Sequence, residues 1–253
     1  MDPISKTMEK HFEAIDVQMD EMISNGFSHE SIHQFRESIR QLRALLLYYQ
    51  PVIRTSDYRE LELISKNVFN MTSLIREIDV FENGYYPYMN PQTMYKLATL
   101  KKPLLLKLKE DIENTKSFKF KNYQLHIKSD EHIGSERMVE LYQTLVEHCL
   151  LAVDNEEKNI HNKRMLAKKI RYIHDLLIKD RIALVPINVE LDAFQDCAKK
   201  LHDVCVNLRF IGHYQLNDQG LINKLVEDHA TSTKNADIQF EKLCGVLSHF
   251  IEK

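Results

Sequence analysis

An internal repeat constrains the fold of this chain more than any other sequence feature. The segment SIHQFRESIRQLRALLLYYQ (31–50) aligns without gaps on NIHNKRMLAKKIRYIHDLLI (159–178), at an offset of 128 residues. Both copies read H-x2-R-x3-[RK]-x2-R, and both are the second segment in a run of segments with helical periodicity. A chain with such a repeat is expected to fold as two related halves.

The sequence contains few residues that interrupt helices. Its 253 residues include six glycines and six prolines, and apolar residues recur at helical spacing almost throughout, which predicts an all-α protein. The predicted helices span about 5–24, 28–49, 56–82, 91–114, 135–153, 156–180, 188–213, 217–231 and 235–252. Pro103 predicts a kink or a break in the fourth helix. The polar segment 116–134 is predicted to be a connector with a short strand-like stretch.

The charge balance limits the kind of anion that the chain can bind. The net charge is −3, whereas a protein that coats duplex nucleic acid is usually basic as a whole. Any anion site must therefore be a local concentration of Lys and Arg. The first residues lack a secretory signal, and no apolar stretch approaches the length of a membrane span. The four scattered cysteines are expected to be reduced thiols, which suits the cytoplasm.

The repeated basic residues form a stripe along one side of each predicted helix. At about 100° per residue, each set falls within an arc of roughly 80°. The two sets are His33, Arg36, Arg40 and Arg43, and His161, Arg164, Lys168 and Arg171. Glu37 is expected to point away on the other side of His33, leaving the first stripe with few counter-charges. One such stripe alone would more often be a solvated face. Like charges at this spacing repel one another, and two such stripes in the same register are hard to obtain by chance, so together they predict an anion-binding site.

The spacing of these side chains favours a linear polyanion as the ligand. A guanidinium group matches phosphate oxygens in a bidentate way and stays charged at any relevant pH. Residues repeated every three or four positions along a helix suit a polymer with evenly spaced charges. The two histidines can donate hydrogen bonds to the same ligand and titrate near neutrality.

The duplicated pattern resembles the CHAD domain, the histidine-containing α-helical domain whose members bind inorganic polyphosphate. IHQFRESIRQLRALL is similar to the first signature helix of that family, and IHNKRMLAKKIRYIHDLL is similar to the second. SLIREIDV (73–80) and KKLHDVCV (199–206) resemble the arginine-aspartate turns that follow in each half. Both turns lack the expected glycine, Glu77 replaces the aspartate of the first, and His202 replaces the arginine of the second.

The resemblance implies the architecture and the ligand. It implies two four-helix bundles of long antiparallel helices, related by a pseudo-twofold axis, with a basic central pore or groove. The halves would be residues 1–115 and 135–253, joined by the connector 116–134. The eight stripe residues are expected to bind polyphosphate without a metal or cofactor. Polyphosphate-metabolising proteins are candidate partners, and association with polyphosphate granules in the cytoplasm is compatible with this role.

Other functions also fit parts of the sequence. His29-Glu30-x-x-His33 matches the helical zinc-protease signature, but the pattern lacks the further spacing to a third ligand, and His29 meets Glu157 in the repeat. No P-loop or paired-carboxylate cluster accompanies the stripes, which disfavours catalysis on phosphates. Non-specific binding of nucleic acid is disfavoured because few aromatic side chains near the stripes could stack on bases, and Tyr172 is the main candidate. A protein scaffold, or an accessory subunit of a polyphosphate-processing enzyme, is the remaining alternative.

Overall fold

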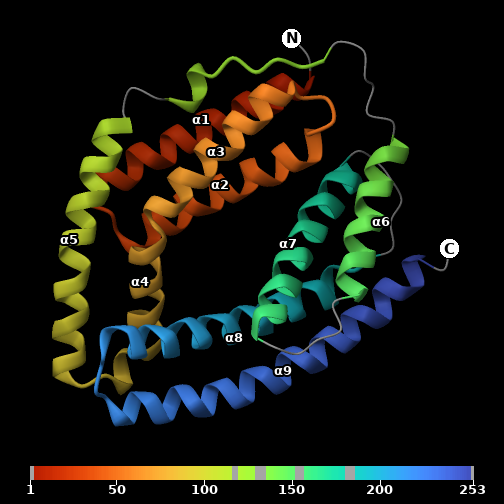
Figure 1. Cartoon of the computed structure of the whole chain (residues 1–253). Helices are drawn as coiled ribbons and strands as arrows, with labels where there is room; N and C mark the ends of the chain where they lie inside the picture. The colour runs from red at the N-terminus through yellow and green to blue at the C-terminus, as the bar shows by residue number, and fades with distance from the viewer. Residues whose placement is uncertain (1–2, 116–118, 129–134, 152–156, 180–185, 252–253) are drawn as a thin grey trace. The chain divides into compact units, whose positions relative to one another are not determined.

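The computed structural model of the chain is all-α, as the sequence predicts (Figure 1). It describes residues 3–115, 119–128, 135–151, 157–179 and 186–251. The α-helices in these ranges are α1 (Pro3–Ser24), α2 (His29–Tyr49), α3 (Thr55–Met71), α4 (Ser73–Tyr85), α5 (Pro91–Thr115), α6 (Ser135–Leu151), α7 (Glu157–Lys179), α8 (Asn188–Tyr214) and α9 (Gln219–Ile251). Two short 3₁₀ helices, η1 (Tyr86–Tyr88) and η2 (Phe120–Asn122), complete the set. No helix within the described ranges has the length and apolarity needed to cross a membrane.

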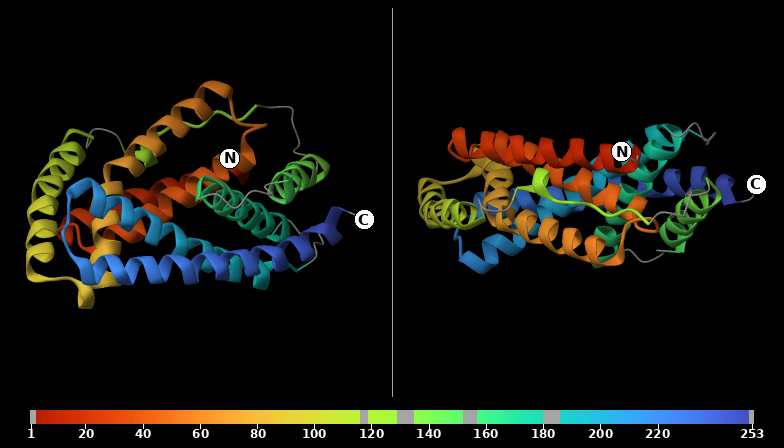
Figure 2. Two further views of the ribbon diagram at one scale, coloured as in Figure 1. Left: turned by 60° about the horizontal axis from the view of Figure 1, so that its bottom comes forward. Right: turned by 90° about the horizontal axis from the view of Figure 1, so that it is seen from above.

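The chain divides into two compact units. Unit 1 comprises residues Met1–Gly84 and Met94–Ile133, and unit 2 comprises Tyr85–Thr93 and Gly134–Lys253. In unit 1, α2 packs against α1 and α3. In unit 2, α7 packs against α6 and α8, and the long helices α8 and α9 run side by side in every view (Figures 1 and 2). Each unit therefore contains one copy of the repeated helix, α2 or α7, packed between neighbouring helices.

The first copy of the repeat begins at a well-formed helix cap. The side chain of Ser28 accepts a hydrogen bond from the backbone N–H of Ser31 at 3.2 Å, and the hydroxyl of Ser31 donates to the carbonyl of Ser28 at 2.9 Å. Such a cap satisfies backbone donors that have no partner inside the helix. Upstream, the chain reverses at Gly26, whose positive φ of 61° suits glycine. The cap and turn fix where the repeated helix starts.

The predicted helix over 56–82 is wrong in one respect, because the structure divides it at Thr72 into α3 and α4. The carbonyl of Phe69 would accept the helical hydrogen bond of the Ser73 N–H in an unbroken helix. It accepts instead from three side chains: the Arg36 guanidinium at 2.8 Å, the Thr72 hydroxyl at 3.0 Å and the Ser73 hydroxyl at 3.3 Å. A donor from a distant helix therefore helps to end α3, which local periodicity cannot reveal.

The predicted pair of helices over 217–231 and 235–252 is also wrong, since α9 runs unbroken for 33 residues from Gln219 to Ile251. The polar stretch around residue 232 suggested a boundary. In the structure, the Thr231 hydroxyl donates to the carbonyl of Glu227 at 3.1 Å, and the Thr233 hydroxyl donates to that of His229 at 2.9 Å. Hydroxyls that bond back to the preceding turn allow threonine to remain inside a helix. The fourth helix, α5, likewise continues through Pro103.

Within unit 1, residues 119–128 are held against α1 and α3 by two buried carboxylates. Asp16 on α1 accepts hydrogen bonds from the backbone N–H groups of Phe120 and Lys121, both at 3.0 Å. Asp57 on α3 accepts from the N–H of His126 at 2.9 Å, next to an isolated antiparallel bridge between Ile53 and Ile127. Of the predicted connector 116–134, residues 116–118 and 129–134 lie outside the described part; within 119–128 the expected strand-like stretch is this single bridge, and side chains of two helices hold the segment in place.

Replacement of Asp16 should show how much this attachment stabilises unit 1. In Asp16→Ala, two backbone donors beside a buried side chain lose a charged acceptor, so we expect the free energy of unfolding to fall by about 2 kcal/mol. Asp16→Asn keeps one acceptor oxygen and should lie between the two. Urea unfolding measures the effect, with the exposed Glu13→Ala as the matched control on α1. Equal stability of Asp16→Ala and wild type would contradict the role of this carboxylate.

Candidate functional site: basic clusters in the two units

Arg36 is a partly buried cation of the first stripe, and it is anchored to the junction of α3 and α4. Its guanidinium lies 3.7 Å from the centre of the Phe69 ring and donates to the hydroxyls of Thr72 and Ser73 at 2.9 and 3.1 Å. Burial, together with the positive charges of Arg40 and Arg76, lowers the pKa of Arg36 to about 10. Arg36 thus remains cationic at neutral pH, in a position where other cations face it.

Arg76 on α4 joins the first stripe from a different helix. The pKa of His33 is lowered by burial, then by the charges of Arg76 and Arg40. Since Arg76 also lowers the pKa of Arg36, it lies close enough to both residues to add to their positive field. The stripe on α2 is therefore part of a cluster of His33, Arg36, Arg40 and Arg76, which we call the unit 1 cluster.

The outer residues of the first stripe differ from the inner ones. Arg40 forms an ion pair with Glu37 one turn earlier on α2. The expectation that Glu37 points away is therefore wrong, because a long side chain at i+3 can reach back across the helix surface. Arg43 is exposed, and its charge acts on Tyr58 of α3, whose pKa is raised by burial and lowered in part by Arg43. Positive charge thus extends along α2, partly balanced by Glu37.

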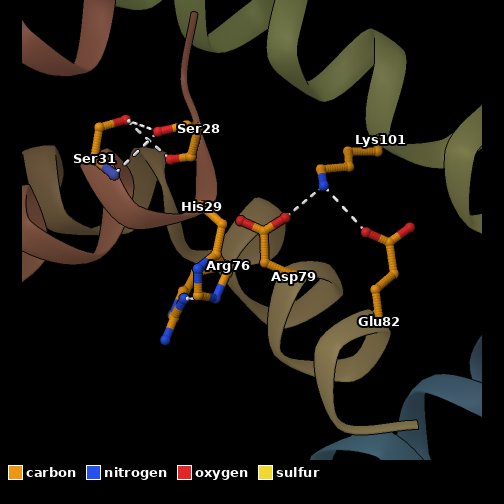
Figure 3. A network of polar contacts seen from close by, with 7 residues as sticks. All are labelled: Ser28, His29, Ser31, Arg76, Asp79, Glu82 and Lys101. Atoms are coloured by element: carbon orange, nitrogen blue, oxygen red, sulfur yellow. Dashed lines mark hydrogen bonds and ion pairs between the residues drawn. The ribbon is translucent and has the colours of Figure 1, made fainter. Parts of the chain in front are cut away.

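The zinc-protease signature has a different environment from that of a metal site. Nε2 of His29 is hydrogen-bonded to Nη1 of Arg76 (Figure 3). On α5, Lys101 forms ion pairs with Asp79 at 2.5 Å and Glu82 at 3.1 Å. Within the described residues, no group of three or more His, Cys, Asp or Glu side chains is arranged to hold a metal ion. His29 therefore belongs to the surroundings of the unit 1 cluster.

Unit 2 contains a pair of histidines at the corresponding helix. The ring centres of His161 on α7 and His202 on α8 lie 5.1 Å apart. Burial lowers the pKa of His202, and Arg164, His161, Arg209 and Lys168 contribute in that order, to a value of about 4. The pKa of His161 is lowered by burial and by the same three cations. Both imidazoles are therefore neutral at pH 7 although cations surround them.

The second stripe is divided between two electrostatic settings. Arg164 and Lys168 act on the histidine pair together with Arg209 of α8, and we call His161, Arg164, Lys168, His202 and Arg209 the unit 2 cluster. Arg171, at the end of the stripe, instead forms ion pairs with two acidic residues. These are Asp175 on α7, at 3.8 Å, and Asp192 on α8. The structure therefore brings three of the four predicted residues together and pairs the fourth with acids.

Three residues of these clusters were not among the eight predicted from the stripes. Arg76 and His202 lie in the two short motifs after the repeat, where the missing glycines weakened the match, and their positions in those motifs were the available signal. Arg209 follows His202 by seven residues, which places both on one face of α8. This spacing was visible in the sequence, but it has no counterpart in unit 1 to single it out.

Three comparisons place the chain among known proteins. A family model described as the CHAD domain matches residues 6–212. A search of curated proteins gave no match. Among solved structures, PptA from Streptomyces chartreusis is similar with a TM-score of 0.59 and 10% sequence identity, over 96% of this chain and 99% of that one. At this identity the likeness concerns the fold alone, whereas the family model covers both copies of the repeat.

The depressed pKa of His202 predicts that acid destabilises unit 2. An unfolded imidazole binds a proton near pH 6.5, whereas folded His202 does so only near pH 4, so the unfolded state gains protons first as the pH falls. The stability contributed by neutral His202 is present above pH 6.5 and is lost between about 6.5 and 4. Urea midpoints across this range should therefore fall less steeply for His202→Gln than for wild type. The exposed His148→Gln serves as control, and identical slopes for all three proteins would refute this role of His202.

Proposed function

Because this chain belongs to the CHAD domain family, whose members are linked to polyphosphate, we propose that it binds inorganic polyphosphate or a similar linear polyanion. The proposed ligands of the phosphates are the eight stripe residues. The structure adds Arg76, His202 and Arg209 as candidates because their charges or rings face the stripes. The family membership inferred from the repeat is confirmed, and the binding function is what the geometry of the clusters supports best.

The mutual repulsion inside each cluster is the observation that carries this proposal. Burial and then two further arginines lower the pKa of Arg36, and burial and then three cations together with His161 lower that of His202. Holding like charges together destabilises the folded chain unless an anion compensates them. A polyanion with several phosphates would compensate several of these charges at once. A single carboxylate compensates one charge, as Glu37 does for Arg40.

The chemistry of the side chains favours phosphate over other anions. Arginine offers a planar set of donors that fits two phosphate oxygens, and neutral histidine donates one further hydrogen bond. Because His33, His161 and His202 have lowered pKa values, they are neutral in the free protein and can gain a proton beside a phosphate. A cluster of this composition thus adapts its charge to the ligand.

We further propose a binding module with no catalytic role of its own. The acidic residues next to the stripes, Glu37, Asp175 and Asp192, are paired with stripe arginines. This arrangement supports a structural role for these acids. We also propose the division into 1–115, 116–134 and 135–253, with two bundles arranged by a pseudo-twofold axis around a basic pore or groove. A cytoplasmic location with granule association, and partnership with polyphosphate-metabolising proteins, are proposed with it.

Direct binding measurements test the proposed ligand. We expect the purified protein to bind long-chain polyphosphate more tightly than heparin, RNA or short oligophosphates, with an affinity that falls linearly with the logarithm of salt concentration. Fluorescence titration with each polyanion at several salt concentrations measures both quantities. Equal affinity for all polyanions at matched charge would reduce the function to general electrostatic attraction, and no binding of polyphosphate would reject it.

A double variant tests whether the stripes form the site. Arg40→Gln/Lys168→Gln removes one cation from each stripe and leaves Arg36 anchored to Phe69. We expect polyphosphate affinity to fall by on the order of tenfold or more, and the salt slope to fall by about two, because two phosphate contacts are lost.

The matched control for this variant is Arg59→Gln/Lys200→Gln. It removes the same charge from exposed positions on α3 and α8. Long-range attraction depends on net charge, so any effect of this control measures that contribution alone. If the stripe variant and the control lose affinity equally, the stripes are not the binding site.

A further inference from the structure

His29, the first histidine of the discarded zinc signature, has a specific contact that the proposed function does not yet use. It lies at the start of α2, one turn before His33, and its Nε2 is hydrogen-bonded to Nη1 of Arg76 on α4 (Figure 3). The contact joins residues 47 positions apart in the sequence. It therefore connects the beginning of the repeated helix to the one arginine of the unit 1 cluster that α2 does not provide.

The chemistry of this contact fixes the state of the imidazole. A guanidinium group has only donors, so Nε2 of His29 must be the acceptor. The proton of a neutral ring is then on Nδ1, and a doubly protonated ring could not make the bond. Burial lowers the pKa of His29, and the charge of Arg76 lowers it further, so the neutral form predominates at pH 7.

Other charged groups around His29 offset only part of this lowering of its pKa. Asp79 on α4 and Glu30 on α2 raise its pKa, whereas Lys101 on α5 lowers it. Asp79 is almost fully buried, at 2% exposure, and Lys101 holds one of its carboxylate oxygens (Figure 3). The pKa of Lys101 is raised because its bonds to Asp79 and Glu82 outweigh the opposing effect of burial. A fixed network on α4 and α5 therefore surrounds the histidine.

The contact favours the position of Arg76 because neighbouring cations repel it. Its charge acts on both His33 and Arg36, so an acceptor on α2 helps to keep the guanidinium beside them. A neutral acceptor holds the side chain without cancelling its charge, whereas a carboxylate would neutralise it. An imidazole nitrogen meets both requirements, and the cap formed by Ser28 and Ser31 fixes the backbone that carries it.

We propose that His29 is a positioning residue, which holds Arg76 in the unit 1 cluster so that this arginine binds phosphate. The inference rests on the proposed function and extends it, since it assigns Arg76 as a ligand and His29 as the residue that orients it. His29 itself does not contact the polyanion. Protonation of its ring removes the acceptor and places a second cation against Arg76, so the contribution of Arg76 to binding is lost in acid.

A mutant cycle at pH 8 tests the coupling between the two residues. Leucine at position 29 cannot accept a hydrogen bond, whereas the side-chain oxygen of glutamine can occupy a position close to that of Nε2. We expect His29→Leu and Arg76→Ala each to weaken polyphosphate binding by on the order of tenfold. The double variant should be no weaker than either single variant. His29→Gln should bind within about twofold of wild type.

The pH profile separates positioning from a general structural role. The ratio of the dissociation constants of Arg76→Ala and wild type should shrink toward one as the pH falls through the pKa of His29, which lies below 6.5. With glutamine at position 29 in both proteins, this ratio should change less with pH, and the remaining change reports the effect of Arg76 on His33. His148→Leu, an exposed histidine on α6, controls for the substitution, and thermal unfolding confirms that each variant is folded.

The outcomes distinguish this inference from the function on which it rests. Additive losses in the double variant, unchanged binding by His29→Leu, or a pH-independent ratio in the wild-type background would each overturn the positioning role while polyphosphate binding stands. Absence of binding by the wild-type protein would overturn the proposed function, and the inference with it. Rescue by glutamine together with non-additive losses is the result that we expect.

Discussion

The hydrogen bonds between Arg36 and the junction of α3 and α4 determine much of the structure of unit 1. The Phe69 carbonyl and the hydroxyls of Thr72 and Ser73 all accept from Nη1 of Arg36 and so share the N–H groups of this one nitrogen. This arrangement ends α3 and lets α4 start in a new direction. Arg76 then lies on the first turn of α4, where its charge reaches α2. A single stripe residue therefore both helps to break a helix and brings a second helix to the candidate site.

Unit 2 contains similar kinds of residues in a different arrangement. Lys163 occupies the position in the repeat that Phe35 has in unit 1, and both side chains are buried. The ammonium of Lys163 lies 4.2 Å from the centre of the Phe240 ring on α9, so an aromatic face meets a cation inside the unit. His202 replaces the arginine, so the unit 2 cluster has a second imidazole beside His161. Each cluster thus combines three cations with neutral imidazoles, one in unit 1 and two in unit 2.

The repeat and the stripes were predictable because they depend on local periodicity. The spacing from His33 to Arg43 follows from the helix alone, and so does the buried face of Ile32, Phe35 and Ile39. The break at Thr72 was not predictable, since it requires a donor that lies 36 residues earlier in the chain. The continuity of α9 was missed because threonines that suggest a boundary form hydrogen bonds within the helix. The pairing of Arg40 with Glu37 shows that angular position does not fix where a long side chain ends.

Lowered histidine pKa values couple the candidate site to pH in a way that arginines alone could not. Burial, and after it the charges of nearby cations, lower the pKa values of His33, His161 and His202 below their ordinary value. In the proposed complex a bound polyanion adds negative charge beside these imidazoles, which would raise their pKa values. Binding and proton uptake are then linked, and each must favour the other by the same free energy. His29 acts in the opposite sense, because its protonation removes the acceptor that holds Arg76. In acid, proton uptake by the cluster histidines favours polyanion binding, whereas protonation of His29 disfavours it. The pH dependence of the affinity would therefore reflect the difference between these two effects.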